Sequence, residues 1–385
     1  MTVIYMDNNA TTQVAPEVFE EMRPYFCDLY ANPSSMHSFG GRVQRKIDEA
    51  RERVAQFLGA QPSEIIFTSC GTESDNTAIR GIVDAAPDRR HVITTRVEHP
   101  AVLNVARYLA EKGYAVTELG VDSEGRLDLD ELRGALTDQT ALVSIMWANN
   151  ETGAIFPVEE IARIVKEQGA VFHCDAVQAA GKIPIDMSGS AIDLLSISGH
   201  KLHASKGVGV LYVRRGTRIR PLLIGGHQEH GRRGGTENTA SIIGLGKACE
   251  IAADSLEEEA VRVRGLRDRL ERELLARCPE TGRNGGATER LPNTSNLAFA
   301  YVEGEAILLL MDEHGICASS GSACTSGSLE PSHVLRAMGV PYTMIGGSVR
   351  FSLSRYNTDA EVDQVVAVVP SIIERLRQIS PFAKT

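Results

Sequence analysis

The sequence has 385 residues, of which 43% are hydrophobic and 23% are charged, and its formal net charge is -10. This composition is typical of a soluble globular protein, and the length suffices for a large domain with a smaller one. The negative charge argues against nucleic acid and anionic membrane as partners, and no apolar run is long enough to span a bilayer. The amino-terminal residues do not resemble a signal peptide.

The seven cysteines are scattered along the chain, and none forms a Cys-x-x-Cys pair. An odd number without paired spacing argues against a disulfide framework and against a structural zinc site. We therefore expect a reducing, cytoplasmic location and no bound metal. Most cysteines in such a protein are small buried hydrophobes. We apply this interpretation to Cys27, Cys174, Cys249 and Cys317.

The first part of the chain is dominated by helical patterns after a turn-rich opening over 7–12. Pro16 suits the first turn of a short helix, because that turn tolerates proline. Between Val43 and Leu58, apolar residues repeat at helical spacing on one face and charged residues fill the other. Gly59 follows this pattern directly and marks the end of the helix.

From Glu64 onwards, short apolar runs alternate with helical segments. The seven candidate strands are 65–68, 92–94, 116–119, 141–146, 171–174, 193–197 and 208–213. This rhythm predicts an α/β fold with a mostly parallel sheet of about seven strands covered by helices. The last one or two strands follow short connections and could run antiparallel.

The pattern changes after a basic, glycine-rich loop over 225–236. A helix near 242–252 is expected next, and then a separate charged helix over 263–274. The carboxy-terminal third mixes helices with strands over 294–300 and 348–353, which predicts a smaller α+β domain. The expected domains are 16–255 for the large one, and 1–15 together with 256–385 for the small one.

The segment Ser198-Gly199-His200-Lys201 lies between two predicted strands. Partial burial at the end of a strand lowers the pKa of a lysine and frees its nucleophilic form. A lone lysine is more often solvated, but Asp175 stands at the end of another apolar run. A lysine that forms a Schiff base and an aspartate that pairs a pyridinium nitrogen are what pyridoxal 5'-phosphate requires. The sequence therefore predicts this cofactor.

Further polar groups follow other apolar runs, at the strand ends where open α/β sheets bind ligands. Gly71 and Thr72 open a helix, whose bare N–H groups could hold a phosphate or form an ordinary cap. His99 could lie flat on a cofactor ring. Asn150 could bond a ring oxygen or cap a turn. Gln178 follows a third strand and could face the same cavity.

Two features of the carboxy-terminal third carry chemistry. The segment 319–328 consists of small residues around Cys324, and this composition is typical of a flexible tether. A tethered thiol can reach a site, accept a group and carry it away. Arg350 lies in a predicted strand, where it could clamp a substrate carboxylate or form an interdomain salt bridge.

With these motifs the chain resembles the pyridoxal-phosphate cysteine desulfurases of the NifS/IscS type nearly from end to end. The most specific matches are Ser198-Gly199-His200-Lys201 and the segment 319–327. The long serine-rich loop is similar to the first group of the family, and 146–153 is similar to its nitrogen-fixation branch. The resemblance implies a fold-type I homodimer that takes sulfur from L-cysteine and passes it to an iron–sulfur scaffold protein.

The resemblance also implies a role for each matching residue. Lys201 would hold the cofactor, His99 would stack on its ring, Asp175 would pair its ring nitrogen, and Cys324 would become a persulfide. The other implied contacts are Gln178 and Asn150 at the ring oxygen, Gly71, Thr72, Ser198 and His200 at the phosphate, Thr236 of a partner subunit at the same phosphate, and Arg350 with Asn150 at the substrate.

Other functions were weighed on the same residues. An aminotransferase and a selenocysteine lyase would share the lysine site, and the serine-rich cysteine loop argues only against the first. A sulfur-carrier scaffold without catalysis has no use for Lys201, Asp175 and His99 together. A nicotinamide dehydrogenase lacks its glycine fingerprint here.

Overall fold

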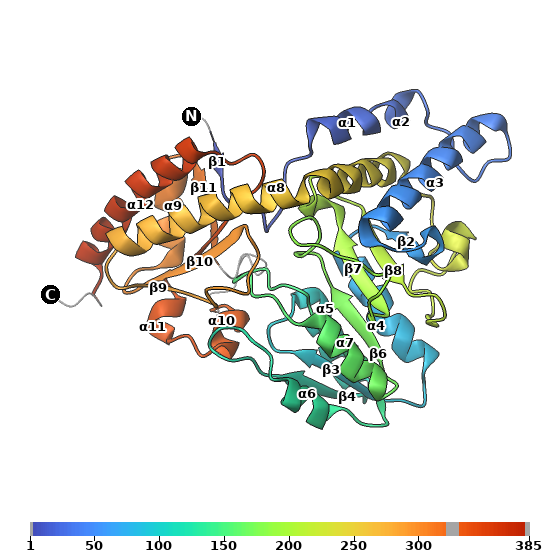
Figure 1. The fold of residues 1–385 in the computed structure, drawn as a ribbon, viewed down its shortest axis with the longest axis horizontal. Helices are drawn as coiled ribbons and strands as arrows, with labels where there is room; N and C mark the ends of the chain where they lie inside the picture. Colours follow the sequence, from blue (N-terminus) through green and yellow to red (C-terminus); the bar gives the residue numbers. More distant parts are fainter. Residues whose placement is uncertain (1–2, 321–330, 382–385) are drawn as a thin grey trace.

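The computed structural model describes residues 3–320 and 331–381. Its two parts are joined by one helix, α8 (Thr239–Arg277), which runs along both of them in Figure 1. The sequence pattern suggested two separate helices here. They form one helix of 39 residues, because no glycine or proline interrupts the stretch 253–262. The expected domain boundary near 255 therefore falls inside a helix.

A seven-stranded sheet forms the centre of the larger part. Its strands are β2 (Ile65–Thr68), β3 (His91–Thr95), β4 (Ala115–Leu119), β5 (Thr140–Ser144), β6 (Val171–Asp175), β7 (Leu194–Ser198) and β8 (Gly209–Val213). Their spatial order is β2-β8-β7-β6-β5-β3-β4. Only β8 runs antiparallel to its neighbours, so both the predicted strands and the antiparallel final strand are confirmed.

Helices cover both faces of this sheet (Figure 1). The helices of the larger part that precede α8 are α1 (Pro16–Met22), α2 (Pro24–Cys27), α3 (Ser38–Leu58), α4 (Gly71–Ala85), α5 (Pro100–Glu111), α6 (Leu129–Ala135) and α7 (Val158–Glu167). Apolar residues of α4 and α5 pack with one face of the sheet, and those of α1, α3, α7 and α8 pack with the other. The alternation of side chains along each strand separates these two cores.

The smaller part contains a four-stranded antiparallel sheet in the order β12-β13-β10-β9. Its elements are β9 (Thr281–Arg283), β10 (Thr294–Phe299), α9 (Gly304–Asp312), β11 (Ile316–Cys317), β12 (Ser319–Ser320), α10 (His333–Ala337), α11 (Tyr342–Ile345), β13 (Ser348–Ser352) and α12 (Asp359–Ile379). The amino-terminal β1 (Ile4–Tyr5) pairs with β11 in parallel, so the chain starts on the smaller part.

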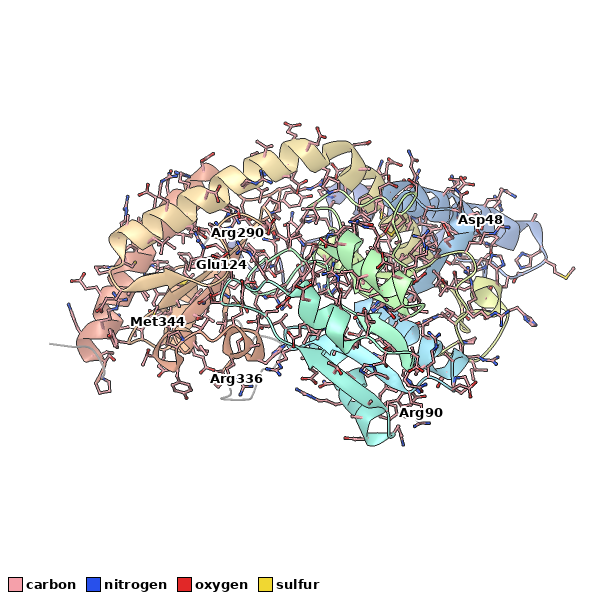
Figure 2. The ribbon with its side chains drawn as sticks, turned by 60° about the horizontal axis from the view of Figure 1, so that its bottom comes forward. Asp48, Arg90, Glu124, Arg290, Arg336 and Met344 are labelled. Carbon is pink, nitrogen blue, oxygen red and sulfur yellow. The ribbon has the colours of Figure 1, made fainter. Side chains whose placement is uncertain are left out.

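A buried ion pair fixes α8 to the smaller part. Arg290 donates to both carboxylate oxygens of Glu271 over 2.6 and 2.7 Å. Ser295 of β10 donates to the same carboxylate over 2.8 Å. Figure 2 shows Arg290 on the inner side of the long helix.

Among the residues that the structure describes, no helix has both the length and the apolar character that crossing a membrane requires.

Candidate active site

Lys201 lies at the end of the short helical turn η2 (Gly199–Lys201), which follows β7. Its Nζ donates to the backbone carbonyl oxygens of Asn9 and Ala10, each over 2.6 Å. The N–H of Thr12 donates in turn to the carbonyl oxygen of His200 over 2.9 Å. The amino-terminal segment therefore wraps around the lysine predicted to be reactive, a contact between residues almost 200 positions apart in sequence.

Asp175 ends the neighbouring strand β6 and is 6% exposed. Its carboxylate accepts a hydrogen bond from the backbone N–H of Val177 over 2.9 Å. Burial raises the pKa of Asp175 to about 6, although the Val177 N–H and the nearby charge of Lys201 lower it. The predicted acid and the predicted amine are thus electrostatically coupled, and the carboxyl titrates close to neutral pH.

His99 caps the amino terminus of α5, and its Nδ1 accepts from the backbone N–H of Ala101 over 3.1 Å. Burial lowers the pKa of His99 to about 4, and the charges of Lys201 and His333 lower it further. The ring is therefore neutral at physiological pH. Because Nδ1 is an acceptor, the ring proton is on Nε2. This ring nitrogen is the one that could donate to or exchange a proton with a ligand.

The predicted phosphate site combines the start of α4 with the end of β7. A Cβ atom at Gly71 would lie 2.9 Å from Val177 Cγ2 and 3.5 Å from Ser198 Cβ, so a side chain here would displace Val177. The Ser198 hydroxyl is buried and has no hydrogen-bond partner among the described residues. An unpaired hydroxyl facing a helix amino terminus suits an anion such as a phosphate. The residues present therefore fit the cofactor.

Thr72 and His200 border this site. Thr72 is the second residue of α4, in the turn whose N–H groups lack helical partners. Nδ1 of His200 is hydrogen-bonded to Thr11 Oγ1 over 3.2 Å. Burial lowers the pKa of His200 to about 4, and neighbouring lysines, Lys201 first, lower it further. His200 is therefore neutral, and it can contribute hydrogen bonding rather than charge.

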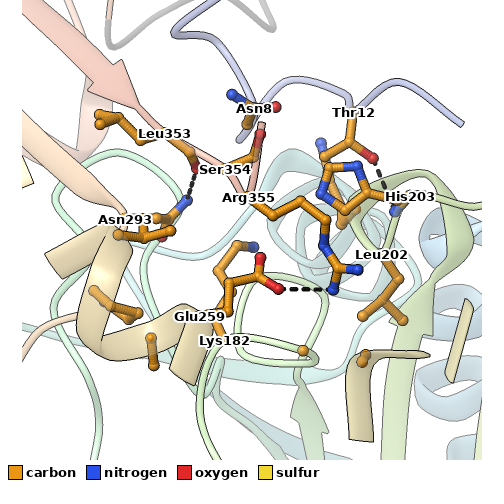
Figure 3. A pocket seen from close by; sticks show the side chains of 16 residues that line it. Asn8, Thr12, Lys182, Leu202, His203, Glu259, Asn293, Leu353, Ser354 and Arg355 are labelled. Carbon is orange, nitrogen blue, oxygen red and sulfur yellow. Dashed lines mark hydrogen bonds and ion pairs between the residues drawn. The ribbon is translucent and has the colours of Figure 1, made fainter. Parts of the chain in front are cut away.

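The side-chain amide of Gln178 is hydrogen-bonded within the protein. The side chain donates to the carbonyl oxygen of Asn9 over 3.0 Å and accepts from Lys182 Nζ over 3.2 Å. Lys182 lines a small cavity of about 40 Å³ that also reaches Lys201 and the ion pair Arg355–Glu259 (Figure 3). Burial lowers the pKa of Lys182 to about 7, and the charge of Lys201 adds to this effect.

Arg350 is buried on β13 and reaches toward the larger part. Its Nη2 donates to Asp7 over 2.8 Å, and its Nη1 donates to the backbone oxygen of Asn150 over 3.0 Å. The salt bridge is formed with Asp7, which belongs to the expected small domain as Arg350 does, so it is not the interdomain salt bridge that the sequence left open. Only the hydrogen bond to Asn150 crosses to the larger part. The role at a substrate carboxylate remains chemically available. Asn150 meets Arg350 through its backbone in this arrangement.

Two predicted site residues are not assembled with the others. Thr236 lines a separate surface hollow with Ser69 and Gly207. Cys324 belongs to the segment 321–330, which lies outside the described residues. The structure brings together Lys201, Asp175 and His99 through their electrostatic coupling, and it places Gly71 against Ser198.

Sequence reasoning missed several groups around this site. Asp7 and Asn9 were interpreted only as part of a turn, although they contact Arg350 and Lys201. Glu98 is fully buried beside Asp175, and Lys182 contacts Gln178. The available signal for Glu98 was its position directly before His99, a predicted site residue.

Comparisons with known proteins identify the family of this chain. Residues 4–365 match the family model of the class-V aminotransferases. A cysteine desulfurase of Nostoc is 63% identical over 99% of this chain and 96% of its own length. Cysteine desulfurase NifS of Azotobacter vinelandii is 59% identical over 99% of this chain and 95% of its own length.

A solved structure of a NifS-like protein superposes with a TM-score of 0.92 at 41% identity and covers 97% of this chain and 100% of that one. These findings confirm the predicted fold and favour the desulfurase over the other enzymes that were weighed. They also confirm the predicted cofactor, because the enzymes of this family depend on pyridoxal phosphate. The chain therefore belongs to the class-V aminotransferase family, among its pyridoxal-phosphate-dependent cysteine desulfurases.

Proposed function

We propose that Lys201, Asp175, His99 and Cys324 together remove sulfur from L-cysteine, releasing L-alanine and leaving a persulfide on Cys324. The observation that carries this proposal is that Lys201, Asp175 and His99 lie at or just after the carboxyl ends of β7, β6 and β3, where the charge of Lys201 lowers the pKa of both other groups. An amine, a buried acid and a neutral imidazole are three different proton-handling groups in one site. This combination suits removal of the Cα proton from a substrate bound to pyridoxal phosphate.

Each residue has a distinct task in the proposal. Pyridoxal phosphate, when bound, withdraws electrons from the substrate Cα. Lys201 would hold the cofactor and, as a free amine, take the Cα proton. Asp175 would stay ionised and stabilise a protonated ring nitrogen. His99 would lie over the ring and donate a hydrogen bond from its Nε2–H, while the ammonium of Lys201 would return the proton to the product, because a neutral imidazole that lost its one ring proton would become an anion.

Sulfur transfer is assigned to Cys324. Its thiolate forms a bond to the substrate sulfur while the substrate carbon–sulfur bond breaks, and the remaining carbon skeleton takes up a proton and leaves as alanine. Gly71, Thr72, Ser198 and His200 would hold the cofactor phosphate, with Asn150 and Gln178 beside the ring. Arg350 would hold the substrate carboxylate in exchange for its contact with Asp7.

An absorption spectrum of the purified protein with and without L-cysteine tests the cofactor site. We expect a visible band that changes on adding L-cysteine and sulfide release under a reductant. Cys324→Ser should keep the band and its response but lose sulfide release. The interpretation of Cys27 as a buried cysteine is wrong, because Cys27 is exposed at the end of the four-residue helix α2. Cys27→Ser is therefore the matched control and should behave as the wild type. A Cys324→Ser variant that still makes alanine at the full rate would disprove the role of Cys324.

We further propose that the enzyme is a homodimer in which Thr236 of one subunit completes the phosphate site of the other. Exposed apolar side chains support this proposal, because Met36, Ile224 and Tyr30 are fully or largely solvent-accessible in the single chain. Light scattering after size-exclusion chromatography gives the mass. Thr236→Ala should weaken cofactor binding in the dimer, and a monomer with full activity would contradict the proposal.

We propose that the sulfur acceptor is an iron–sulfur scaffold protein in the cytoplasm that serves nitrogenase assembly. The likeness to NifS of Azotobacter vinelandii and the six free cysteines among the described residues support this view. Transfer of labelled sulfur from Cys324 to a purified scaffold protein would test it. Sulfur that leaves only as free sulfide would argue against a protein acceptor.

A further inference from the structure

A polar patch lies within the sheet face that α4 covers. On this face, His173 and Asp175 occupy alternate positions of β6, and Ser144 of β5 and Ser196 of β7 are their neighbours across the ladder. His173 is fully buried and is hydrogen-bonded through Nδ1 to Ser144 Oγ over 2.8 Å and through Nε2 to Ser196 Oγ over 2.9 Å. The patch thus lies directly behind Asp175.

Asp75 of α4 is the acid that faces this patch. It is 1% exposed, one helical turn beyond the predicted phosphate site at Gly71. Its Oδ1 lies 3.6 Å from Nε2 of His173 and has no hydrogen-bond partner among the described residues. The Ser196 hydroxyl hydrogen-bonds the Asp75 side chain. A buried acid with so few partners is costly if it is ionised.

The neighbouring charges act differently on Asp75 and Asp175: those around Asp75 are negative, whereas Asp175 has a cation nearby. Burial raises the pKa of Asp75 well above its usual range, Asp175 raises it further, and Glu98 and Cys70 act in the same direction. Only the Ser196 hydroxyl opposes these effects. His173 supplies no positive charge, because burial lowers its pKa to about 3.

Asp175, in contrast, has the backbone N–H of Val177 as a donor and the ammonium of Lys201 as a nearby cation. Two neighbouring buried carboxyls cannot both ionise cheaply, and the one with a donor and a cation keeps the charge. The remaining proton therefore belongs to Asp75. The third acid, Glu98, also favours its neutral form, because burial raises its pKa to about 8.

We propose that Asp75 is a positioning residue that remains protonated behind Asp175 and, through Ser196 and His173, keeps Asp175 as the only charged carboxyl of this compartment. The proposal rests on the proposed role of Asp175 toward the cofactor ring. No proton leaves Asp75 during the reaction. Its neutral carboxyl donates a hydrogen bond within the patch. Because Asp75 carries no negative charge, Asp175 can remain ionised.

Infrared spectroscopy of the holoenzyme near pH 7 tests the protonation directly. We expect Asp75→Asn to remove one carbonyl band of a protonated carboxylic acid and Glu98→Gln to remove a different one. Asp84→Asn is the matched control, because Asp84 is exposed on the same helix and should remove none. A spectrum of Asp75→Asn that retains every protonated-carboxyl band would overturn the proposal.

A second measurement tests the positioning role. Asp75→Asn keeps a neutral donor of the same shape, so the release rate of the cofactor and the pH midpoint of its visible band should stay near the wild-type values. Asp75→Val removes the hydrogen bonds and should release the cofactor about tenfold faster, with a displaced midpoint. Ser196→Ala breaks the same link without altering α4, and should act in the same direction even if Asp75→Val fails to fold.

An unchanged release rate and midpoint in Ser196→Ala would contradict the positioning role. Failure of the underlying function is distinguishable from this result. If Asp175→Asn left the visible band and its midpoint unchanged, the proposed pairing of Asp175 with the ring nitrogen would be wrong. The infrared band assigned to Asp75 would report its protonation independently of that outcome.

Discussion

Buried carboxyls occur beside both sheets, but their surroundings shift the carboxyl pKa in opposite directions. At the edge of the seven-stranded sheet, burial raises the pKa of Asp175 to about 6 and that of Glu98 to about 8. Beside the small sheet, burial also acts to raise the pKa of Glu271, but the hydrogen bonds and charge of Arg290 lower it below its usual value. Figure 2 shows Arg290 under the long helix.

The difference separates chemistry from support. Carboxyls without a close guanidinium have raised pKa values, so their charge depends on the other groups around them, as is typical of functional sites. Glu271 accepts from Arg290, Ser295 and Arg283, so its charge is fixed and it holds α8 against β10. At the structural site, donors and cations fully pair the charge of Glu271. At the candidate active site, the buried carboxyls of Asp175 and Glu98 have too few donors and cations to offset the cost of their burial.

Lys201→Ala gives the largest expected effect at the sheet edge. Loss of the amine that binds the cofactor and takes the Cα proton should reduce alanine formation from L-cysteine by about ten-thousandfold. Initial rates and the visible spectrum provide the measurement. Lys206→Ala is a control, since Lys206 is in the adjoining exposed loop. A modest loss in Lys201→Ala would break the comparison, because the sheet edge would then not be the reaction centre.

Glu271→Gln should act on stability instead. Removing one partner of a buried ion pair leaves Arg290 with only the more distant Asp268, 3.7 Å away, and should reduce the free energy of unfolding by about 3 kcal/mol. Urea unfolding measures this loss, with Glu258→Gln, exposed on the same helix, as the control. The activity of the folded fraction and its pH profile should be unchanged. A shifted pH profile would show that the small sheet also takes part in the chemistry.

Arg350→Lys sharpens the boundary between the two regions, because Arg350 is buried in the small sheet but contacts Asn150 of the larger part. Lysine cannot offer the planar pair of donors, so KM for L-cysteine should rise by roughly ten- to thirtyfold, about 2 kcal/mol. Steady-state kinetics provide the test. Arg272→Lys, at an exposed position on α8, should leave KM unchanged. An equal KM in both variants would mean that Arg350 does not bind the substrate and serves only its salt bridge with Asp7.

Glu98→Gln should change the pH dependence of stability between pH 7 and the Glu98 pKa of about 8. An unfolded glutamate has a pKa of about 4.3, so in this window the folded state holds a proton that the unfolded state has lost. Glu98 therefore contributes a fall in the free energy of unfolding with rising pH, by about 1 kcal/mol per unit. Lys182, whose pKa burial lowers to about 7, contributes a rise over the same window, and the buried histidines act in the same direction as Lys182. Both of these effects are present in the wild type and in Glu98→Gln, so the difference between the two slopes reports Glu98.

Urea unfolding at both ends of this window supplies the measurement, and Glu111→Gln on the exposed side of α5 is the control. The slope of the control should equal that of the wild type, and the slope of Glu98→Gln should be more positive by about 1 kcal/mol per pH unit. Equal slopes in all three proteins would mean that Glu98 is ionised in the folded state, which would remove the contrast with Glu271.

The sequence alone determined the strands of the large sheet, the antiparallel final strand and the residues at the strand ends. The reason is local, because side-chain periodicity reports which face of an element is buried. Lys201 and Asp175 were found in this way. The two helices expected over 242–274 were the exception, since a continuous helix and two abutting helices have the same periodicity.

The tertiary structure decided which groups meet. The carbonyl oxygens of Asn9 and Ala10 reach Lys201, Asp7 reaches Arg350, and Asp75 faces His173, all across long stretches of sequence. Periodicity predicts that a residue is buried but not what it is buried against. The charge state of an acid depends on its neighbours in space, so Asp175, Glu98 and Glu271 acquired their different roles only in the folded chain.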